Sequence, residues 1–306
     1  MKKLEIIKTE HLKNTMCETS VAIGFFDGIH LAHQKVINNA IRLAKNNNIK
    51  SVVITFDESP KMALGHSDFK NYITPFDEKM SILKEIGVDY AFVLTTDETL
   101  LNLSAKDFIK EYLLTLNAKY VSVGFDFKFG KNGQGDISTL KQCNSFSTEV
   151  ICALDIDDTK VSSSFIKEQL ARGNLFLVNK FLGRNFFITA TVVKGKQLGR
   201  TIGYPTANLI LKGGSIFGLL GVFATKIYID GVMYPSMTNI GFNPTVSDEF
   251  KILVETHIFD FSEEIYGKVV RLEFIDKIRD EIKFSDLFEL TTQLDNDKKN
   301  ARKILN

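Results

Sequence analysis

The chain has 306 residues, of which 44% are hydrophobic, and this length favours two domains, each with its own core. Its 38 basic and 37 acidic residues leave a net charge of +1, so no overall field would draw it to nucleic acid or to an anionic membrane. The cysteines are few and form no Cys-x-x-Cys pair, which argues against a disulfide framework and a structural zinc site (Cys17, Cys143 and Cys152). No apolar run approaches the ~18 residues of a membrane helix, and charges interrupt the N-terminus too often for a signal peptide. We therefore expect a soluble, unprocessed, cytoplasmic protein.

In the first half, short apolar runs alternate with segments of helical periodicity. We expect strands at residues 21–26, 51–56, 90–94 and 120–124, and helices at residues 31–45, 77–86 and 105–116. Strands buried on both faces and separated by helices predict an α/β domain with a parallel sheet, in which ligands bind beyond the carboxyl ends of the strands. Gly24 and Gly124 both lie at such ends.

The first strand leads into the stretch GFFDGIHLAHQ, residues 24–34. The Asp27-Gly28 pair ends the strand, and His30 and His33 follow at the start of the next helix. Backbone N–H groups are unpaired at a helix N-terminus and the helix dipole favours anions, so two imidazoles on one face would complete a phosphate pocket. The alternative is two solvent-facing histidines in a first helical turn.

A second strand end carries GFDFKFGK, residues 124–131. It is not a Walker P-loop, because five residues separate Gly124 from Gly130 and Asn132 stands where Ser or Thr would bind magnesium. The stretch is a second candidate phosphate site. The alternative is an aromatic turn that packs under the sheet.

A third candidate is VSSSFIK, residues 161–167, before a helix that we expect to run to Ala171. Serines at a helix start usually serve as caps. Capping is compatible with phosphate binding, since hydroxyls and free N–H groups can share one anion.

Together these stretches resemble the HxGH nucleotidylyltransferases, and most closely their FMN adenylyltransferase (FAD synthetase) branch. The resemblance implies direct adenylyl transfer from ATP to FMN, with magnesium bridging phosphates and Phe127 at the flavin. Three positions depart from the family pattern: Ala32 replaces a glycine, Ser59 a histidine and Lys167 an arginine, which loses the bidentate fork. The implied ATP-binding residues are Gly24, Phe25, Asp27, His30, His33, Asp126, Ser163, Ser164 and Lys167, with the two histidines as catalytic groups.

After an amphipathic connector at residues 175–181, the pattern changes, and we place a domain boundary between residues 1–183 and 184–306. Extended segments are expected at residues 186–193, 222–229, 232–239, 253–259 and 269–275, and Asp230-Gly231 predicts a tight hairpin. These strands predict a small antiparallel β-barrel. A final helix at residues 284–305 would carry an apolar side formed by Phe284, Leu287, Phe288 and Leu294.

The second half contains GKQLGRTIGYPTANL, residues 195–209. In an extended segment Thr206 and Asn208 point to one face, so their oxygens could both reach a hard cation such as magnesium. The alternative is a surface loop. Further on, Glu255 lies mid-strand among apolar residues, where an unpaired carboxylate is costly unless it faces a polar site or solvent. His257 shares its face and is left unassigned.

Residues 195–209 resemble the riboflavin kinase signature. Four further stretches extend the similarity: NIGFNPT (239–245), VETH (254–257), IYG (265–267) and KIR (277–279). The resemblance implies that Glu255 is the base acting on the ribityl hydroxyl, and that magnesium binds Thr206 and Asn208. It also implies an ATP site at Gly199, Gly203, Pro205 and Thr206, and flavin contacts at Asn239 and Arg279. A charged loop explains Arg279 equally well.

The sequence therefore predicts a bifunctional transferase that converts riboflavin to FMN and FMN to FAD, with ATP as co-substrate, Mg²⁺ as cofactor and no nucleic-acid or membrane partner. Two alternatives stay open: only one half is active, or the protein is a flavin-binding regulator without turnover. We expect a monomer or a weak homo-oligomer.

Overall fold

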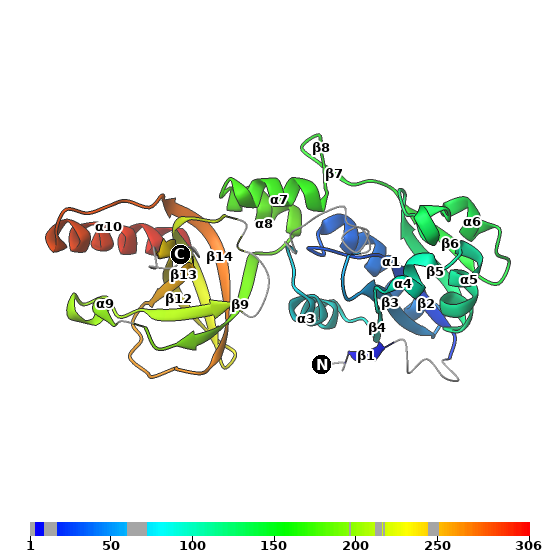
Figure 1. The fold of residues 1–306 in the computed structure, drawn as a ribbon, viewed down its shortest axis with the longest axis horizontal. Helices are drawn as coiled ribbons and strands as arrows, with labels where there is room; N and C mark the ends of the chain where they lie inside the picture. The colour runs from blue at the N-terminus through cyan, green and yellow to red at the C-terminus, as the bar shows by residue number, and fades with distance from the viewer. Residues whose placement is uncertain are drawn as a thin grey trace. The chain divides into compact units, whose positions relative to one another are not determined.

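The computed structural model describes residues 4–8, 17–59, 72–195, 197–211, 216, 218–243 and 251–306. The motif positions Lys196, Pro244 and Thr245 lie outside these residues. The chain divides into two compact units, Met1–Ser163 and Ser164–Asn306, and Figure 1 shows the elements of each. In the described part of the chain, no helix is both long enough and apolar enough to cross a membrane.

The first unit contains a six-stranded sheet in the order β1-β4-β3-β2-β5-β6, and every strand pair in it is parallel. The strands are β1 (Glu5–Lys8), β2 (Thr19–Ile23), β3 (Lys50–Phe56), β4 (Tyr90–Leu94), β5 (Ala118–Gly124) and β6 (Ser147–Ile151). The predicted α/β class is confirmed. The edge strands β1 and β6 were not predicted from the sequence.

Helices connect these strands: α1 (Leu31–Asn46), α3 (Phe76–Ile86), α4 (Glu98–Asn102), α5 (Ala105–Phe108), the π-helix η2 (Ile109–Leu114), the 3₁₀ turn η3 (Lys131–Gly133) and α6 (Ile137–Lys141). The prediction of one α-helix over residues 105–116 is wrong, because the second part widens into the π-helix. The Tyr112 ring of the π-helix is buried and contacts Phe92 of β4 and Phe108, so the wider turn packs in the hydrophobic core against the sheet.

The strand predicted at residues 21–26 corresponds to β2, which ends at Ile23 instead of Phe26. Phe26 and Ile29 adopt left-handed backbone angles, with φ of 54° and 39°, which no strand permits. Residues 24–30 therefore form a turn between β2 and α1 that is strained at two bulky residues.

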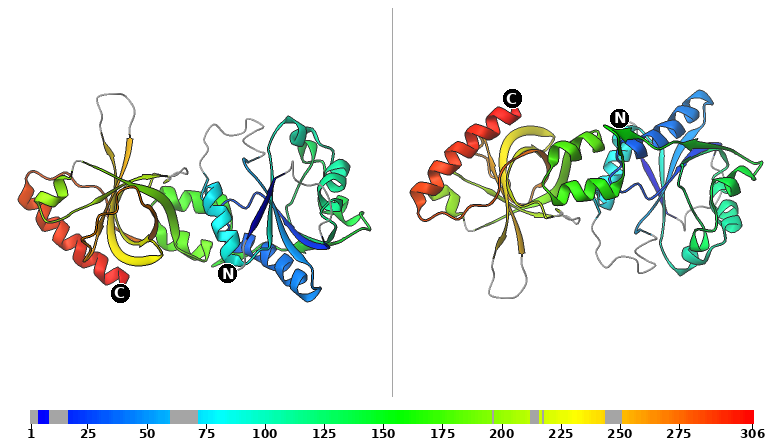
Figure 2. Two further views of the ribbon diagram at one scale, coloured as in Figure 1. Left: turned by 90° about the horizontal axis from the view of Figure 1, so that it is seen from below. Right: turned by 90° about the horizontal axis from the view of Figure 1, so that it is seen from above.

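The second unit is built on a closed antiparallel barrel with the order β10-β13-β12-β11-β14-β9, seen from two sides in Figure 2. Its strands are β9 (Phe186–Val193), β10 (Ala207–Leu211), β11 (Gly221–Ile229), β12 (Val232–Asn243), β13 (Lys251–Ile258) and β14 (Val269–Arg279). The predicted barrel is confirmed, and the hairpin at Asp230-Gly231 joins β11 to β12 with positive φ at both residues.

Shorter elements complete this unit: α7 (Ser163–Ala171) starts at the division between the units, and α8 (Leu175–Leu182) and α9 (Leu198–Thr201) follow. The small hairpin β7 (Asp155–Ile156) and β8 (Thr159–Lys160) precedes α7 in the first unit. The Asn179 side chain ties α8 to the barrel, since its amide donates to Phe274 O and its oxygen accepts from Phe186 N.

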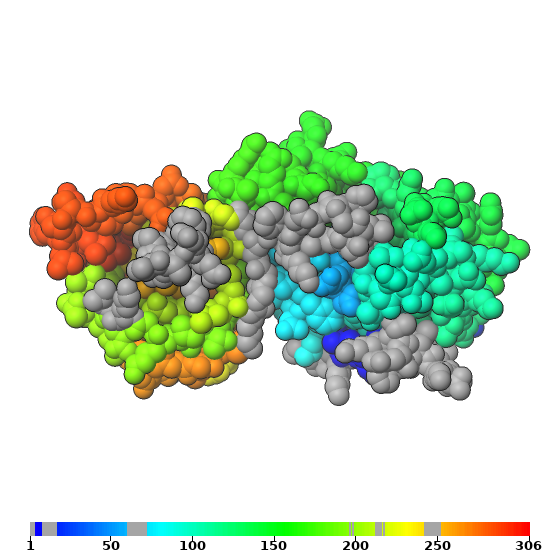
Figure 3. Space-filling view, in the orientation of Figure 1, coloured from blue at the N-terminus to red at the C-terminus, as the bar shows by residue number. Residues whose placement is uncertain are grey.

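The final helix α10 (Leu287–Leu305), orange to red in Figure 3, begins at the N-cap Asp286, so Phe284 precedes it. On the predicted apolar side, Leu287 and Phe288 are 66% and 78% exposed, so only its Leu294 packs on the barrel. Further along the helix, Leu294 and Ala301 pack against the barrel and Asp297 is fully buried.

Candidate active sites

Polar side chains of other elements donate hydrogen bonds to the backbone carbonyls of the turn between β2 and α1. The Phe25 carbonyl accepts hydrogen bonds from Thr55 Oγ1 at 3.0 Å and from Lys79 Nζ at 2.9 Å. The Ile29 carbonyl accepts one from Gln34 Nε2 at 2.9 Å. These bonds stabilise a backbone conformation that its own residues disfavour.

Asp27, predicted to bind ATP, is buried, and its carboxylate accepts from the backbone N–H groups of Ile73 and Thr74 at 2.8 and 3.3 Å. Its own carbonyl accepts from Ser163 Oγ at 2.8 Å. The structure thus brings the first and third predicted stretches together at this turn, and Asp27 positions its backbone. Ser164 and Lys167 follow on α7 in the second unit, with exposed and partly buried side chains.

The two histidines lie together at the start of α1. His30 is the N-cap residue, and its Nδ1 accepts from the backbone N–H of His33 at 3.3 Å. The rings stack with centroids 3.5 Å apart, and the Phe26 ring meets His33 edge-on. Because Nδ1 of His30 is an acceptor, the proton of the neutral ring is assigned to Nε2. The predicted pairing of both imidazoles at a helix N-terminus is confirmed.

The aromatic stretch after β5 divides into a packed part and an exposed part. Phe127, predicted to contact flavin, stacks on Phe129 at 5.6 Å and packs against the core of the first unit. Phe125 is 42% exposed, with Lys160 Nζ 4.5 Å from its ring centroid and 3.7 Å from the Asp126 carboxylate. The alternative of an aromatic turn packed under the sheet therefore describes Phe127, whereas Phe125 and Asp126 face solvent.

Lys79 is a buried residue that the sequence analysis missed. It lies on α3 at helical spacing from Ile82, Leu83 and Ile86, which places it on the buried face of that helix. This spacing is the sequence signal that could have identified Lys79. Burial lowers the pKa of its ammonium group to about 8.

In the second unit, the register of three neighbouring strands aligns three predicted residues. Glu255 on β13 lies directly opposite Asn208 on β10 and Asn239 on β12, so the three side chains occupy one face of the barrel wall. Burial raises the pKa of the Glu255 carboxyl above its ordinary value. A Cβ atom at Gly195 would overlap the Asn208 amide, so a larger residue there would force that side chain to move.

The loop before β10 is fixed by its neighbours. The ring nitrogen Nδ1 of His257 lies 2.8 Å from the Pro205 carbonyl, and a Cβ atom at Gly199 would overlap the Tyr204 carbonyl. Gly203 has a φ of 82°, a conformation that favours glycine. His257, left unassigned from the sequence, thus positions the loop that carries Thr206. Burial lowers the pKa of its imidazole.

Arg279 has a structural partner. Its guanidinium forms a bidentate pair with the fully buried Asp297 of α10, with Nε 3.0 and 2.9 Å from the two carboxylate oxygens and Nη2 2.8 Å from one of them. Gln293 Nε2 also donates to Asp297, at 2.8 Å. Arg279 thus anchors the final helix, and its contact with flavin stays a prediction.

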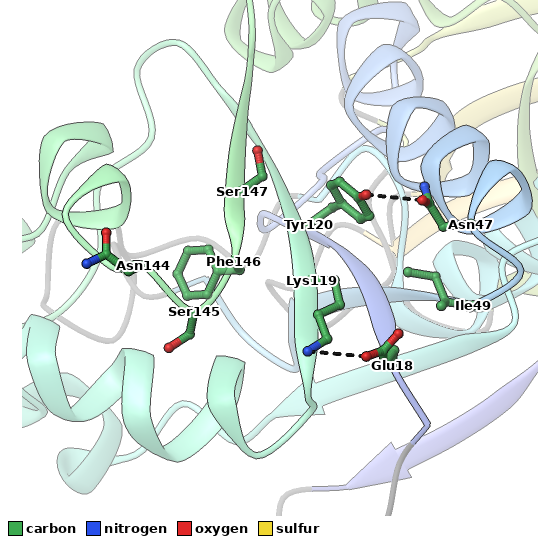
Figure 4. Close-up of a pocket in the computed structure, with 9 residues that line it drawn as sticks. All are labelled: Glu18, Asn47, Ile49, Lys119, Tyr120, Asn144, Ser145, Phe146 and Ser147. Carbon is green, nitrogen blue, oxygen red and sulfur yellow. Dashed lines mark hydrogen bonds and ion pairs between the residues drawn. The ribbon is translucent and has the colours of Figure 1, made fainter.

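A cavity of about 460 Å³ lies elsewhere in the first unit, beside the start of β5 and β6, and is shown in Figure 4. It is lined by polar side chains such as Asn47, Lys119 and Tyr120, and it contains none of the predicted site residues. It lies at the amino ends of the strands, whereas ligands of parallel sheets bind at the carboxyl ends. Among the described residues, no group of three or more His, Cys, Asp and Glu side chains could hold a metal ion.

Two family models match the chain, FAD synthetase over residues 12–165 and riboflavin kinase over residues 182–305. The chain belongs to the bifunctional riboflavin kinase/FMN adenylyltransferase family. The relative of that name from Bacillus subtilis is 36% identical over 98% of this chain and 97% of its own length. The one from Haemophilus influenzae is 33% identical over 99% of this chain and all of its own length. The chain is accordingly a transferase of flavin cofactor biosynthesis, with a riboflavin kinase and an FMN adenylyltransferase half.

Among solved structures, a Streptococcus pneumoniae protein titled a macrolide-efflux protein is 32% identical, with a TM-score of 0.89 over 97% of this chain and 98% of that one. Its title disagrees with both family models. The family models and the curated relatives carry the assignment, because they match both halves of the chain and agree with one another.

Proposed function

We propose that the first unit transfers the adenylyl group. A phosphate oxygen of FMN attacks the α-phosphorus of ATP, and pyrophosphate leaves in line. Such chemistry needs positioning and charge neutralisation more than a nucleophilic side chain. The stacked pair His30 and His33 at the N-terminus of α1 carries this proposal, because it places two imidazoles where the helix dipole favours an anion.

In this site His30 Nε2 donates to the triphosphate, and Gly24 and Phe25 form the turn beneath it. Ser163, Ser164 and Lys167 of α7 hold the leaving pyrophosphate, and Asp126 orients the nucleotide. Flavin binds at Phe127, whose ring is only partly buried, beside the exposed Phe125 ring.

We propose that the barrel phosphorylates riboflavin at Glu255. The carboxylate accepts the proton of the ribityl 5′-hydroxyl as its oxygen attacks the γ-phosphorus of ATP. Glu255 fits this role because its partial burial keeps the carboxylate a stronger base than an exposed one. Asn239, directly opposite, is placed to orient the flavin, and Gly199, Gly203 and Pro205 shape the ATP loop.

Mg²⁺ fits the neutral oxygens of Thr206 and Asn208, which are the hydroxyl and amide ligands that a hard cation accepts alongside phosphate. Bound there, it would neutralise charge on the transferred phosphoryl group. Gly195, which has no Cβ atom, leaves room for the Asn208 amide.

We further propose that residues 1–183 and 184–306 are the functional domains and that the protein works in the cytoplasm as a monomer or weak homo-oligomer. Its partners are then riboflavin, FMN, FAD and ATP, without nucleic acid or membrane.

The test is chromatography of flavins after the protein is incubated with MgATP and either riboflavin or FMN. FAD from both substrates supports two working halves. FMN that accumulates without FAD would mean that Ala32, Ser59 and Lys167 have silenced the first unit, and FAD from supplied FMN alone would mean an inactive kinase. Bound flavin without any product would favour the regulatory alternative.

A further inference from the structure

Lys79 is a nearly fully buried lysine, 2% exposed, beneath the turn that carries the first active site. Its ammonium nitrogen is 2.9 Å from the Phe25 carbonyl, 3.4 Å from Thr55 Oγ1 and 4.1 Å from the centroid of the Phe25 ring. Its hydrogen-bond partners are thus a carbonyl and a hydroxyl. The charges of Asp27 and Asp57 raise the pKa of Lys79, but by less than burial lowers it.

This arrangement costs stability. An ammonium group loses most of its hydration when it is buried. Hydrogen bonds to a backbone carbonyl and a hydroxyl offset less of that desolvation free energy than an ion pair with a carboxylate would. The lowered pKa of Lys79 has the same cause, desolvation by burial. A methionine of similar length would fill the space without that cost, so the need for packing does not explain a lysine here.

The contact is made to the peptide between Phe25 and Phe26, in the strained part of the turn. No described peptide bond is cis, so the N–H of Phe26 points opposite to the carbonyl that Lys79 and Thr55 hold. Phe26 also has a φ of 54°, so this peptide would relax to another orientation without restraint. Lys79 therefore fixes the direction of one N–H group and keeps a positive charge directly under the turn.

We infer that Lys79 is a positioning residue for adenylyl transfer: it sets the Phe25–Phe26 peptide for the phosphates of ATP and supports the developing negative charge from beneath. It touches no reacting atom and acts through the turn. Preorganised dipoles in a site of low dielectric are worth much more than the same groups in water. The inference rests on the proposed adenylyl transfer in the first unit.

The experiment compares Lys79→Met with the full-length wild type and with Lys84→Met, which removes an exposed lysine from the same helix. FAD formation from FMN and ATP gives kcat and the KM for ATP. FMN formation from riboflavin in the same preparation reports on the other half. Thermal unfolding reports on the fold.

For Lys79→Met we expect kcat for FAD formation to fall by on the order of 100-fold, the loss of one preorganised donor, with less change in the KM for ATP. The melting temperature should stay level or rise, and FMN formation and the Lys84→Met variant should match wild type. Thr55→Val removes only the uncharged bond to the same carbonyl, so its kcat should fall less than that of Lys79→Met.

FAD formation within twofold of wild type in a folded Lys79→Met protein would overturn the inference, as would a lowered melting temperature with equal loss of both activities. If Lys79→Met does not fold, Thr55→Val decides, and wild-type kcat in that variant refutes the role of the carbonyl contact. A wild type that forms no FAD from FMN would instead refute the proposed function.

Discussion

At the scale of single residues, the His30 ring caps α1, and in the proposed mechanism it also donates to ATP, so the two tasks can be separated. Asn is a good N-cap, so His30→Asn should keep the helix while it removes the imidazole. We expect FAD formation to fall by about 10²–10³-fold, the loss of one preorganised donor, with an unchanged melting temperature. His30→Ala, the matched control, should lose the cap as well and cost about 1 kcal/mol in the free energy of unfolding. A His30→Asn protein with full FAD formation would contradict the role of the ring.

Glu255 can be tested through its titration. Its pKa is raised by burial, and the carboxylate is the form that accepts a proton, so kcat/KM for FMN formation should fall as pH drops through this raised pKa. The fall should therefore lie above the pH expected from the ordinary value of 4.5.

Glu255→Gln should abolish FMN formation, by at least about 10²–10⁴-fold, and leave FAD formation from supplied FMN intact. Chromatography of both reactions measures this in one preparation. Loss of both activities in a folded variant would refute the division of labour between the units.

At the scale of elements, the pair between β14 and α10 distinguishes a structural arginine from a ligand-binding one. Asp297→Ala leaves the Arg279 charge without its partner in a largely buried site, so it should lower the free energy of unfolding by about 3–5 kcal/mol. Arg302→Met, which breaks the exposed pair with Asp260, should cost less than about 1 kcal/mol. Denaturant unfolding measures both. If Asp297→Ala kept full stability and only raised the KM for riboflavin, Arg279 would belong to the flavin site after all.

The end of β9 offers a second test at this scale. Gly195→Ala places a methyl group where the Asn208 amide now lies, so Asn208 must move. We expect the kinase to lose activity and to need more Mg²⁺ for half-maximal rate, while FAD formation from FMN is unchanged. Gly231→Ala is the control: its φ of 85° makes alanine strained, so it should lower stability, but the open space at this hairpin tip should leave both reactions unchanged. Unchanged kinase activity in Gly195→Ala would separate Asn208 from metal binding.

At the scale of the whole molecule, two reactions in one chain can be complemented between chains. A mixture of Glu255→Gln and His30→Asn proteins should convert riboflavin to FAD, because FMN made by one diffuses to the other. The time course should show a lag that shortens as protein concentration rises. A mixture that accumulates FMN and forms no FAD would mean that FMN is not exchanged through solvent.

The sequence by itself determined the fold class of both units, a parallel α/β sheet and an antiparallel barrel, although it missed the edge strands β1 and β6. Parallel strands that are buried on both faces need continuous apolar runs, and these are separated by helices in the sequence. The hairpin at Asp230-Gly231 needs residues that tolerate positive φ. Both patterns are local, so they can be recognised in the sequence. His30 and His33 were predictable for the same reason, since their spacing and their place after a strand fix them at one helix end.

Tertiary structure alone decided which polar residues support the sites. Lys79 meets Phe25, Asp297 meets Arg279, and Asn208, Glu255 and Asn239 meet in one row, through contacts between segments far apart in the chain. Such contacts depend on strand order and register, which no local pattern encodes. Phe127 packs on the core whereas Phe125 is exposed, and this difference also depends on tertiary structure, because burial is set by what packs on a residue and not by its neighbours in sequence.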